Sequence, residues 1–205
     1  ADGCLDDYDG DYACVGDTSI ELNANADIPT VDSLLSTMEA GNGSNGNMFV
    51  IHALQETTIS DFAVNMNPGL GDIEVYYRPD DYLTVPGANT SNVGWTLIGT
   101  ATDVTSASPD YTNIPVPVNI TIPAGEYYSF HVYATAGVSY TNGTGLGNVY
   151  AADANIEFIE GHGGNPAFNC TFQPRVFNGL IRYDATQSIG VSWLDAVSGL
   201  SLIHI

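Results

Sequence analysis

The sequence contains no lysine, and its only fixed cations are Arg78, Arg175 and Arg182. Against these stand 24 Asp and Glu residues, so the formal net charge is -21 over 205 residues. A protein that binds nucleic acid or an anionic membrane surface needs a basic face to neutralise phosphates. This composition cannot provide such a face, so we expect neither nucleic acid nor a lipid surface as a partner.

Long hydrophobic runs are missing as well. No apolar stretch approaches the ~20 residues that a membrane-spanning helix needs, and no strong helical pattern occurs in the chain. The sequence is nevertheless 44% hydrophobic and carries 12 Tyr and 7 Phe. A disordered acidic chain has few aromatic residues, so we expect a folded acidic domain with tails and no membrane span.

Cysteine is scarce, with Cys4, Cys14 and Cys170 as the three thiols. Cys4 and Cys14 bracket a short loop-rich segment, and this spacing predicts a disulfide that closes a small loop. Cys170 is then left over. An odd cysteine in a secreted protein indicates an intermolecular bridge, a buried free thiol, or a partner missing from the sequence record.

From about residue 47 the apolar residues recur with a period of two, which is typical of β-strands. About ten such runs are separated by Gly, Pro, Asn and Asp. They predict an all-β fold, an antiparallel β-sandwich of the jelly-roll type. We expect a hairpin turn at residues 67–69 (Asn-Pro-Gly). Pro115 and Pro117 cannot donate ladder hydrogen bonds, which places their run at a sheet edge or a bulge.

Three local patterns need a decision. Residues 31–39 fit either a helix capped by Asp32 or a strand, and we favour a strand because everything that follows is β. Residues 176–183 read as one uninterrupted strand. Residues 161–164 (Gly-His-Gly-Gly) read as a loop, and they are no phosphate cradle because a Lys and a following helix are missing.

The pattern divides the chain into an acidic N-terminal tail, residues 1–31, a sandwich domain, residues 32–184, and a C-terminal tail, residues 185–199. Residues 200–205 resemble the translated end of a transposon adapter used in DNA library preparation. We expect them to be a sequencing artefact in a gene from an environmental bacterium. The alternative is an ordinary apolar β-tail.

Each tail carries one strand-like run outside the predicted sandwich. A strand of this kind can complete the sheet of a neighbouring copy, because the edge of a sheet accepts main-chain hydrogen bonds. The alternative is that both tails complete sheets of their own chain. The candidate assembly residues are Ile20, Leu22, Ile189, Val191 and Trp193.

Carboxylates are densest at residues 6–11, where acids surround Gly10. Such a pattern resembles the opening of a calcium loop, with Asp7, Asp9 and Asp11 as candidate ligands. The twelfth position counted from Asp7 is Thr18 instead of the bidentate Glu of an EF-hand, so we expect a looser extracellular calcium turn. The alternative is a solvated acidic tail that holds no cofactor.

Glycosylation sequons, Asn-X-Ser/Thr, begin at Asn42, Asn89, Asn119, Asn142 and Asn169. The motif arises by chance in a chain rich in Asn, Ser and Thr, but its repetition is typical of a secreted glycoprotein. The first residue is Ala, as expected of a mature chain after signal-peptide removal or of an incomplete sequence record. With the lysine-free acidic surface, these features predict an extracellular or cell-surface protein.

No HExxH, Cys-x-x-Cys or Gly-x-Ser-x-Gly motif occurs, and the histidines are scattered along the chain. We therefore expect no enzyme and name no catalytic residue. Aromatic rings on a sheet face can instead stack on sugars. Alternation puts one member of each adjacent pair, 76/77 and 127/128, on the outer face. The aromatic candidates are Tyr76, Tyr77, Tyr82, Trp95, Tyr111, Tyr127, Tyr128 and Tyr133.

Seven short motifs follow one another between residues 33 and 184, at residues 41–49, 72–77, 94–100, 122–128, 140–144, 148–155 and 174–179. In order and spacing they resemble an uncharacterised β-sandwich domain of secreted bacterial proteins, often from Bacteroidetes-type organisms. The resemblance implies an exported surface or matrix protein, usually one module of a larger polypeptide. It supplies no catalytic residue, and this chain differs from the usual setting by its short tails.

We therefore predict an extracellular structural protein, a self-assembling filament or surface-polymer subunit whose partners are copies of itself, joined by β-strand addition. The alternative is a secreted carbohydrate-binding or adhesion module, which requires an exposed aromatic strip and glycan partners. A hydrolase is the third interpretation, and it requires a deep pocket with a carboxylate or His of perturbed pKa.

Overall fold

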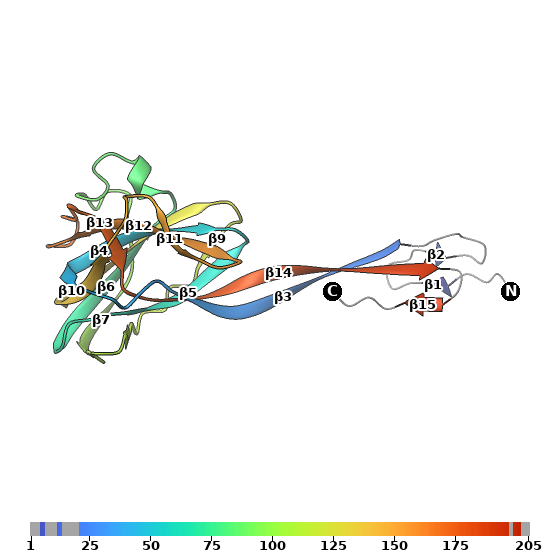
Figure 1. The fold of residues 1–205 in the computed structure, drawn as a ribbon, viewed down its shortest axis with the longest axis horizontal. Helices are drawn as coiled ribbons and strands as arrows, with labels where there is room; N and C mark the ends of the chain where they lie inside the picture. Colours follow the sequence, from blue (N-terminus) through green and yellow to red (C-terminus); the bar gives the residue numbers. More distant parts are fainter. Residues whose placement is uncertain (1–4, 7–11, 14–20, 197–198, 202–205) are drawn as a thin grey trace. The chain divides into compact units, whose positions relative to one another are not determined.

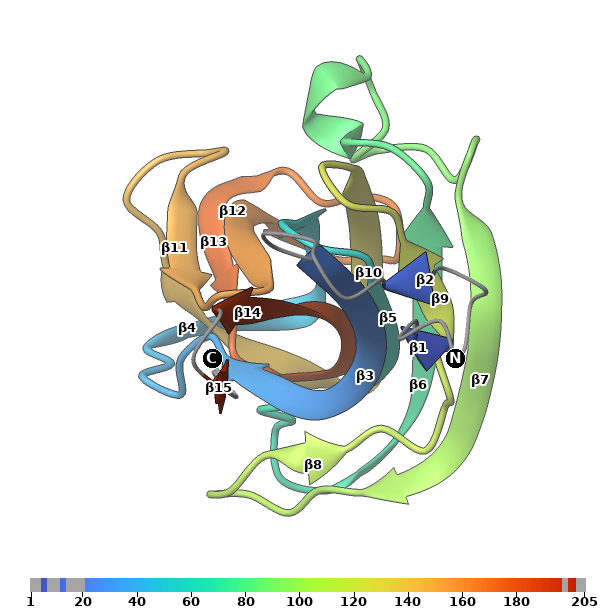
Figure 2. The ribbon, with the colours of Figure 1, turned by 90° about the vertical axis from the view of Figure 1, so that its right-hand side faces the viewer.

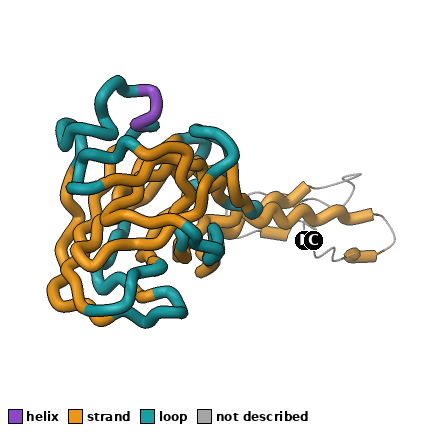
Figure 3. The backbone as a smooth tube through the Cα atoms, turned by 60° about the vertical axis from the view of Figure 1, so that its left-hand side comes forward, coloured by secondary structure: helices purple, strands orange, loops and turns teal. Residues whose placement is uncertain are grey.

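The computed structural model describes the backbone of residues 5–6, 12–13, 21–196 and 199–201, and the side chains of residues 32–185. The chain forms two compact units, residues 29–186 and residues 1–28 together with 187–205. The first unit is an all-β body (Figure 1). Its described residues contain one helical turn, η1 (Tyr82–Thr84), drawn purple in Figure 3. Among the described residues, no helix is long and apolar enough to cross a membrane.

One sheet has seven strands, and each of its recorded pairings is antiparallel. β4 and β13 each pair with both β10 and β12, so these four strands form a closed ring of pairings at the centre of the sheet. β7 and β11 lie at its two ends. The strands are β4 (Asn42–Ala53), β6 (Leu70–Arg78), β7 (Thr96–Thr105), β10 (Tyr127–Asn142), β11 (Val149–Ala152), β12 (Ile156–Gly164) and β13 (Phe172–Phe177).

The other large sheet has six strands, with β5 and β14 at its centre. β8 and β9 both pair with β5, and β3 and β15 both pair with β14. The strands are β3 (Glu21–Leu35), β5 (Thr57–Val64), β8 (Thr112–Asn113), β9 (Ile120–Ile122), β14 (Gly179–Ala196) and β15 (Gly199–Ser201). A separate two-stranded sheet joins β1 (Leu5–Asp6) and β2 (Tyr12–Ala13).

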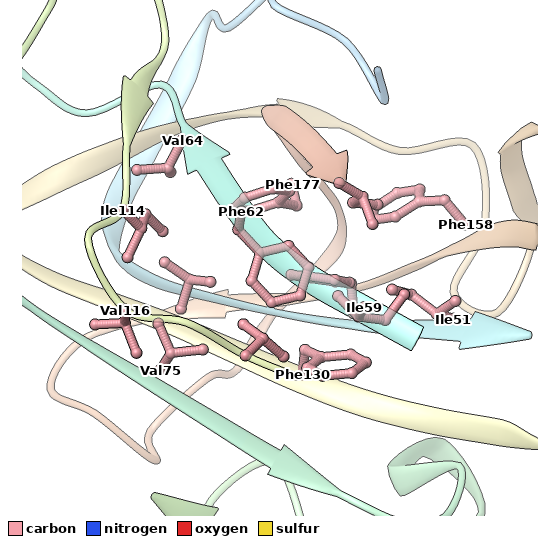
Figure 4. Close-up of a cluster of buried hydrophobic side chains, with 14 of the residues drawn as sticks. Ile51, Ile59, Phe62, Val64, Val75, Ile114, Val116, Phe130, Phe158 and Phe177 are labelled. Atoms are coloured by element: carbon pink, nitrogen blue, oxygen red, sulfur yellow. The ribbon is translucent and has the colours of Figure 1, made fainter. Parts of the chain in front are cut away.

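The two large sheets pack face to face around one apolar core, which makes the body an antiparallel β-sandwich (Figure 4). In β6, buried residues alternate with more exposed ones over most of the strand, as the period of two predicts. Phe49 of β4 is the centre of the core. Its ring centroid lies between 4.7 and 6.0 Å from those of Phe62, Phe130, Phe158 and Phe177. Rings from both sheets therefore interlock in one cluster.

The prolines lie where their chemistry requires. Residues 114–119 separate β8 from β9 and run along the edge of β5. The Ile114 N–H donates to the Phe62 carbonyl at 3.0 Å, and the Val118 N–H donates to the Ser60 carbonyl at 2.8 Å. Pro115 and Pro117 alternate with the buried residues and are exposed. The sequence-based prediction of an edge position is confirmed.

Several local predictions stand and several are wrong. Residues 31–35 belong to β3, so the strand interpretation is confirmed over that part of 31–39. Residues 67–69 form no hairpin turn, because β5 and β6 belong to different sheets and the segment crosses between them. The predicted strand 176–183 is broken at the buried Asn178, where the chain passes from β13 in one sheet to β14 in the other.

Residues 161–164 are strand, not loop, since they form the end of β12. Glycine is required there by close packing. A Cβ on Gly161 would lie 2.1 Å from the Met48 carbonyl oxygen, and one on Gly164 would lie 2.2 Å from the Asn169 carbonyl oxygen. The glycine-rich composition therefore reflects crowding by neighbouring backbone and not a turn.

We predict that Phe49→Ala lowers the free energy of unfolding by about 3–5 kcal/mol, because it opens a cavity among four aromatic rings. Leu70→Ala is the matched control, since Leu70 is 58% exposed and exposed sites usually change stability by less than about 0.5 kcal/mol. Urea unfolding of both variants measures the difference. Equal losses of stability would show that the core is not centred on Phe49.

Candidate functional site

The two terminal strands, β3 and β14, each include residues of both compact units. β14 is 18 residues long and β3 is 15. From Gly179 to Ala185, β14 pairs antiparallel with β5 inside the body. The strand then runs on to Ala196 in the second unit, and β3 pairs with β14. Each terminal strand therefore belongs partly to the body and partly to the second unit.

Four of the five candidate assembly residues lie on these two strands. Leu22 is part of β3, and Ile189, Val191 and Trp193 are part of β14. Ile20 lies outside the described residues.

The edges of the body differ in what they offer to another strand. The β8–β9 edge carries Pro115 and Pro117, which lack an N–H and so weaken pairing with a further strand. β11 is only four residues long. β7 is ten residues long, and in the described part of the chain it pairs with β6 alone. Figure 2 shows β7 along the right-hand side of the body with no strand beyond it.

All three arginines are engaged by their own chain. Arg78 binds Asp80, whose hydrogen bond raises the pKa of the guanidinium, and its Nη1 donates to the Val93 carbonyl at 3.1 Å. The Nη1 of Arg175 donates to the Pro174 carbonyl at 2.7 Å, and its guanidinium carbon lies 5.5 Å from the Tyr140 ring centroid. These two cations therefore serve internal contacts.

The third arginine, Arg182, pairs with Asp61, and its Nη2 donates to Asn113 Oδ1 at 2.7 Å. These side chains line an open groove of about 610 Å³ beside β5, together with Ser60, Ile114, Pro115, Val116, Pro117 and Asn119. The lining of the groove combines polar side chains with two prolines. Its only cation is already neutralised by a carboxylate from the neighbouring strand.

A second buried cluster covers the outer face of the seven-stranded sheet. Met48, Val50 and Ile159 from the sheet pack against Tyr82, Ala88 and Cys170 from two loops. The Trp95 indole N–H donates to the Ala88 carbonyl at 2.9 Å and so fixes one loop over this face. The central part of the sheet is therefore buried on both sides, which is why its strands read as long apolar runs.

His131 and Cys170 lie side by side in this second cluster. The His131 Nε2 is 3.8 Å from the Cys170 Sγ, and both residues are 0% exposed. Burial lowers the pKa of His131 to about 3 and raises the pKa of Cys170 to about 12. Near neutral pH the pair is thus an uncharged imidazole and a thiol, unlike the thiolate that a nucleophilic cysteine needs.

His162 lies on the opposite edge of β4 from His131. His131 and His162 both pair in register with Met48 of β4, one from β10 and one from β12. The His162 Nδ1 forms a 2.8 Å hydrogen bond with the Tyr82 hydroxyl, and burial lowers the pKa of His162. Among the described residues, no group of three or more His, Cys, Asp or Glu is arranged to hold a metal ion.

The alternation predicted for the two tyrosine pairs is confirmed. Tyr77 and Tyr128 pack against the main core, whereas Tyr76 contacts His131 and Phe168 on the outer face. Of the aromatic candidates, Tyr82 is buried and only two count as exposed, Tyr111 at 37% and Tyr127 at 39%.

One outward ring has a built environment. Tyr127 stacks on His52 with ring centroids 4.0 Å apart and an angle of 2° between the planes. The His52 Nδ1 in turn forms a 2.8 Å hydrogen bond with Glu157 Oε2. This small surface group is the part of the structure to which the carbohydrate-binding alternative would apply.

The sequons occupy the surface to different degrees. Asn42, Asn119, Asn142 and Asn169 are exposed, and Asn89 is half-buried. The Asn89 side-chain amide donates to the Cys170 carbonyl at 2.8 Å, so it already serves the second cluster. The proposed calcium ligands Asp7, Asp9 and Asp11 and the proposed disulfide partners Cys4 and Cys14 lie outside the described residues. Among the described residues, Cys170 is a buried free thiol, which was one of the three alternatives.

Comparison with known proteins adds little to this geometry. No protein-family model matches the chain, and no curated protein does. Among solved structures, the chain is weakly similar to the crystal structure of the infectious bursal disease virus VP2 subviral particle. The sequence identity is 11% and the TM-score is 0.21, over 90% of this chain and 46% of that one. The chain thus spans less than half of that structure.

Sequence reasoning missed the His131–Cys170 pair and the special position of β7. The pair joins residues 39 positions apart, on a strand and on a loop, so no local spacing reveals it. The edge position of β7 depends on the order of strands in the sheet, which a single sequence does not encode directly. The sequence does contain one signal: residues 82–102 carry no charged side chain in an otherwise acidic chain, and this run includes the first part of β7.

We predict that His131 makes the protein less stable as the pH falls. Its pKa is about 3 in the folded chain and ~6.5 in the unfolded chain. Between these values the unfolded chain binds more protons, so the free energy of unfolding falls on acidification by up to ~1.4 kcal/mol per pH unit. Urea unfolding between pH 7 and pH 5 measures this slope.

His131→Gln and His131→Leu should both flatten that slope by up to one proton, whatever they do to stability at pH 7. The comparison is made at low protein concentration. A slope unchanged in both variants would mean that His131 is free to protonate in the folded state.

We also predict that Cys170 resists thiol reagents in the native protein, because it is buried and its pKa is raised to about 12. With an aromatic disulfide reagent at pH 8, followed by mass mapping, Cys170 should label only after unfolding in urea. The unfolded chain should then show one reactive thiol if Cys4 and Cys14 are joined, and three if they are not. Rapid native labelling of Cys170 would contradict the buried assignment.

Proposed function

We propose that this chain is an extracellular, non-enzymatic structural subunit that assembles with copies of itself by β-strand addition. The observation that supports the proposal is that β3 and β14 each include residues outside the unit that forms the sandwich body. The body already has a closed core of its own. The outer parts of these strands are therefore not needed to fill that core.

A pair of strands on its own is marginally stable in water. Extended terminal strands gain stability when they add to a further sheet, because the added main-chain hydrogen bonds satisfy backbone groups that an edge leaves open. Another copy of the chain offers such an edge in every subunit. A head-to-tail contact of this kind, repeated without closure, generates a filament.

Charge sets the conditions for such assembly. With a net charge of -21 per subunit, copies repel one another at low ionic strength. The three arginines are engaged within the chain and give little compensation. The Debye length shortens to ~10 Å at 0.1 M salt, so added salt screens the repulsion between copies. Assembly should therefore need salt or counterions. The exposed sequons fit an extracellular setting.

We predict that the full chain forms filaments in 0.3 M NaCl and disperses in 0.01 M NaCl, as seen by electron microscopy and sedimentation. Leu22→Pro in β3 and Val191→Pro in β14 each disturb one terminal strand. At least one of them should abolish filaments. Leu146→Ser is the control, since Leu146 is 41% exposed in a loop.

Two results would contradict the proposal. One is a wild-type chain that stays monomeric at every salt concentration. The other is a set of filaments that neither terminal-strand variant changes, because the contact would then use some other surface.

A further inference from the structure

Building on the proposed strand addition, we infer that β7 is the acceptor edge and that the outer part of β14, residues 187–194 of a second copy, is the strand that adds to it. The open edges of the body identify the acceptor strand, and the distribution of charge along the chain identifies the donor strand.

The acceptor follows from a comparison of the edges. The β8–β9 edge includes two prolines, and its Ile114 and Val118 N–H groups already bond to β5. β11 has only four residues. β7 offers ten residues without proline. β3 is a longer edge, with 15 residues, but Pro29 interrupts it, so β7 is the longest proline-free edge of the body.

The body holds β7 firmly while leaving its outer edge free. Ala101 and Val104 are each 9% exposed and belong to the main core, whereas Leu97 is 49% exposed. Thr96, Thr100 and Thr102 are exposed as well. An added strand would therefore meet a fixed backbone, a row of threonines and one leucine that gains an apolar contact.

Two register shifts occur between β6 and β7, and in both the extra residue is on β7. Bulged residues leave ladder groups unpaired and bend the strand. Such an edge discourages indiscriminate pairing. It favours a strand whose shape matches the bend, which is what a specific subunit contact needs.

The donor follows from charge. β3 carries Glu21, Asp27 and Asp32 and is interrupted by Pro29. Residues 187–194 (Gln-Ser-Ile-Gly-Val-Ser-Trp-Leu) carry no charge. β7 has one charged residue, Asp103. Like charges on facing strands destabilise a sheet, so in this acidic chain the C-terminal strand pairs with β7 at the lowest electrostatic cost.

Proline substitutions in the full chain test both halves. N–H groups alternate between the two edges of a strand, so Thr96→Pro and Leu97→Pro, at two exposed consecutive positions, together cover both orientations in β7. The variant that keeps the wild-type melting temperature is the acceptor-blocked chain. Val191→Pro is the donor-blocked chain, Ala152→Pro on β11 is the matched edge control, and Leu22→Pro blocks the competing N-terminal strand.

In 0.3 M NaCl we expect the amount of sedimenting polymer to fall at least tenfold in the acceptor-blocked chain and in the donor-blocked chain. Ala152→Pro and Leu22→Pro should keep the wild-type amount. A 1:1 mixture of the two blocked chains should form dimers and nothing larger, because each chain keeps one working half of the contact. Analytical ultracentrifugation measures both results.

The outcomes separate this inference from the proposed function. Two results overturn the assignment of β7 and β14 but leave strand addition standing. One is a wild-type amount of polymer from the acceptor-blocked chain, and the other is a loss of polymer in Leu22→Pro alone. A mixture that stays monomeric also overturns it. If the wild-type chain never polymerises, the proposed function fails and the inference fails with it.

Discussion

The shortage of positive charge is the constraint on which the rest of the molecule depends. Each of the three arginines is held by its own chain, by Asp80, by the Pro174 carbonyl or by Asp61. Contacts between copies therefore cannot rely on ion pairs across an interface. Main-chain hydrogen bonds between uncharged strands avoid the like-charge repulsion that side-chain faces of this protein would meet.

The sandwich has its own apolar core, which does not include the parts of the terminal strands that lie in the second unit. Those parts are therefore free to pair with another copy. Interlocked phenylalanines fill the space between the sheets, and a second cluster under two loops buries the outer face of the central strands. His131 and Cys170 belong to that second cluster, where both are held uncharged. Their burial explains why a histidine and a cysteine lie together here without activated chemistry.

Much of the fold follows from the sequence because β-strand periodicity is a local signal. The run at 72–77 and the edge position of Pro115 could be predicted from neighbouring residues alone. The pairing partners could not, since β5 and β6 are adjacent in sequence but lie in different sheets. The glycines at 161–164 misled for the same reason, because distant backbone creates the crowding that they relieve. The acceptor edge is likewise a property of strand order.

Amide hydrogen exchange measures whether a second strand adds to β7. The full chain is compared as monomers at 0.01 M NaCl and after assembly at 0.3 M NaCl. We expect the amides of Thr96–Thr105 that point away from β6 to become protected on assembly, while those of the β8–β9 edge change little. Unchanged exchange across β7 in assembled material would contradict it.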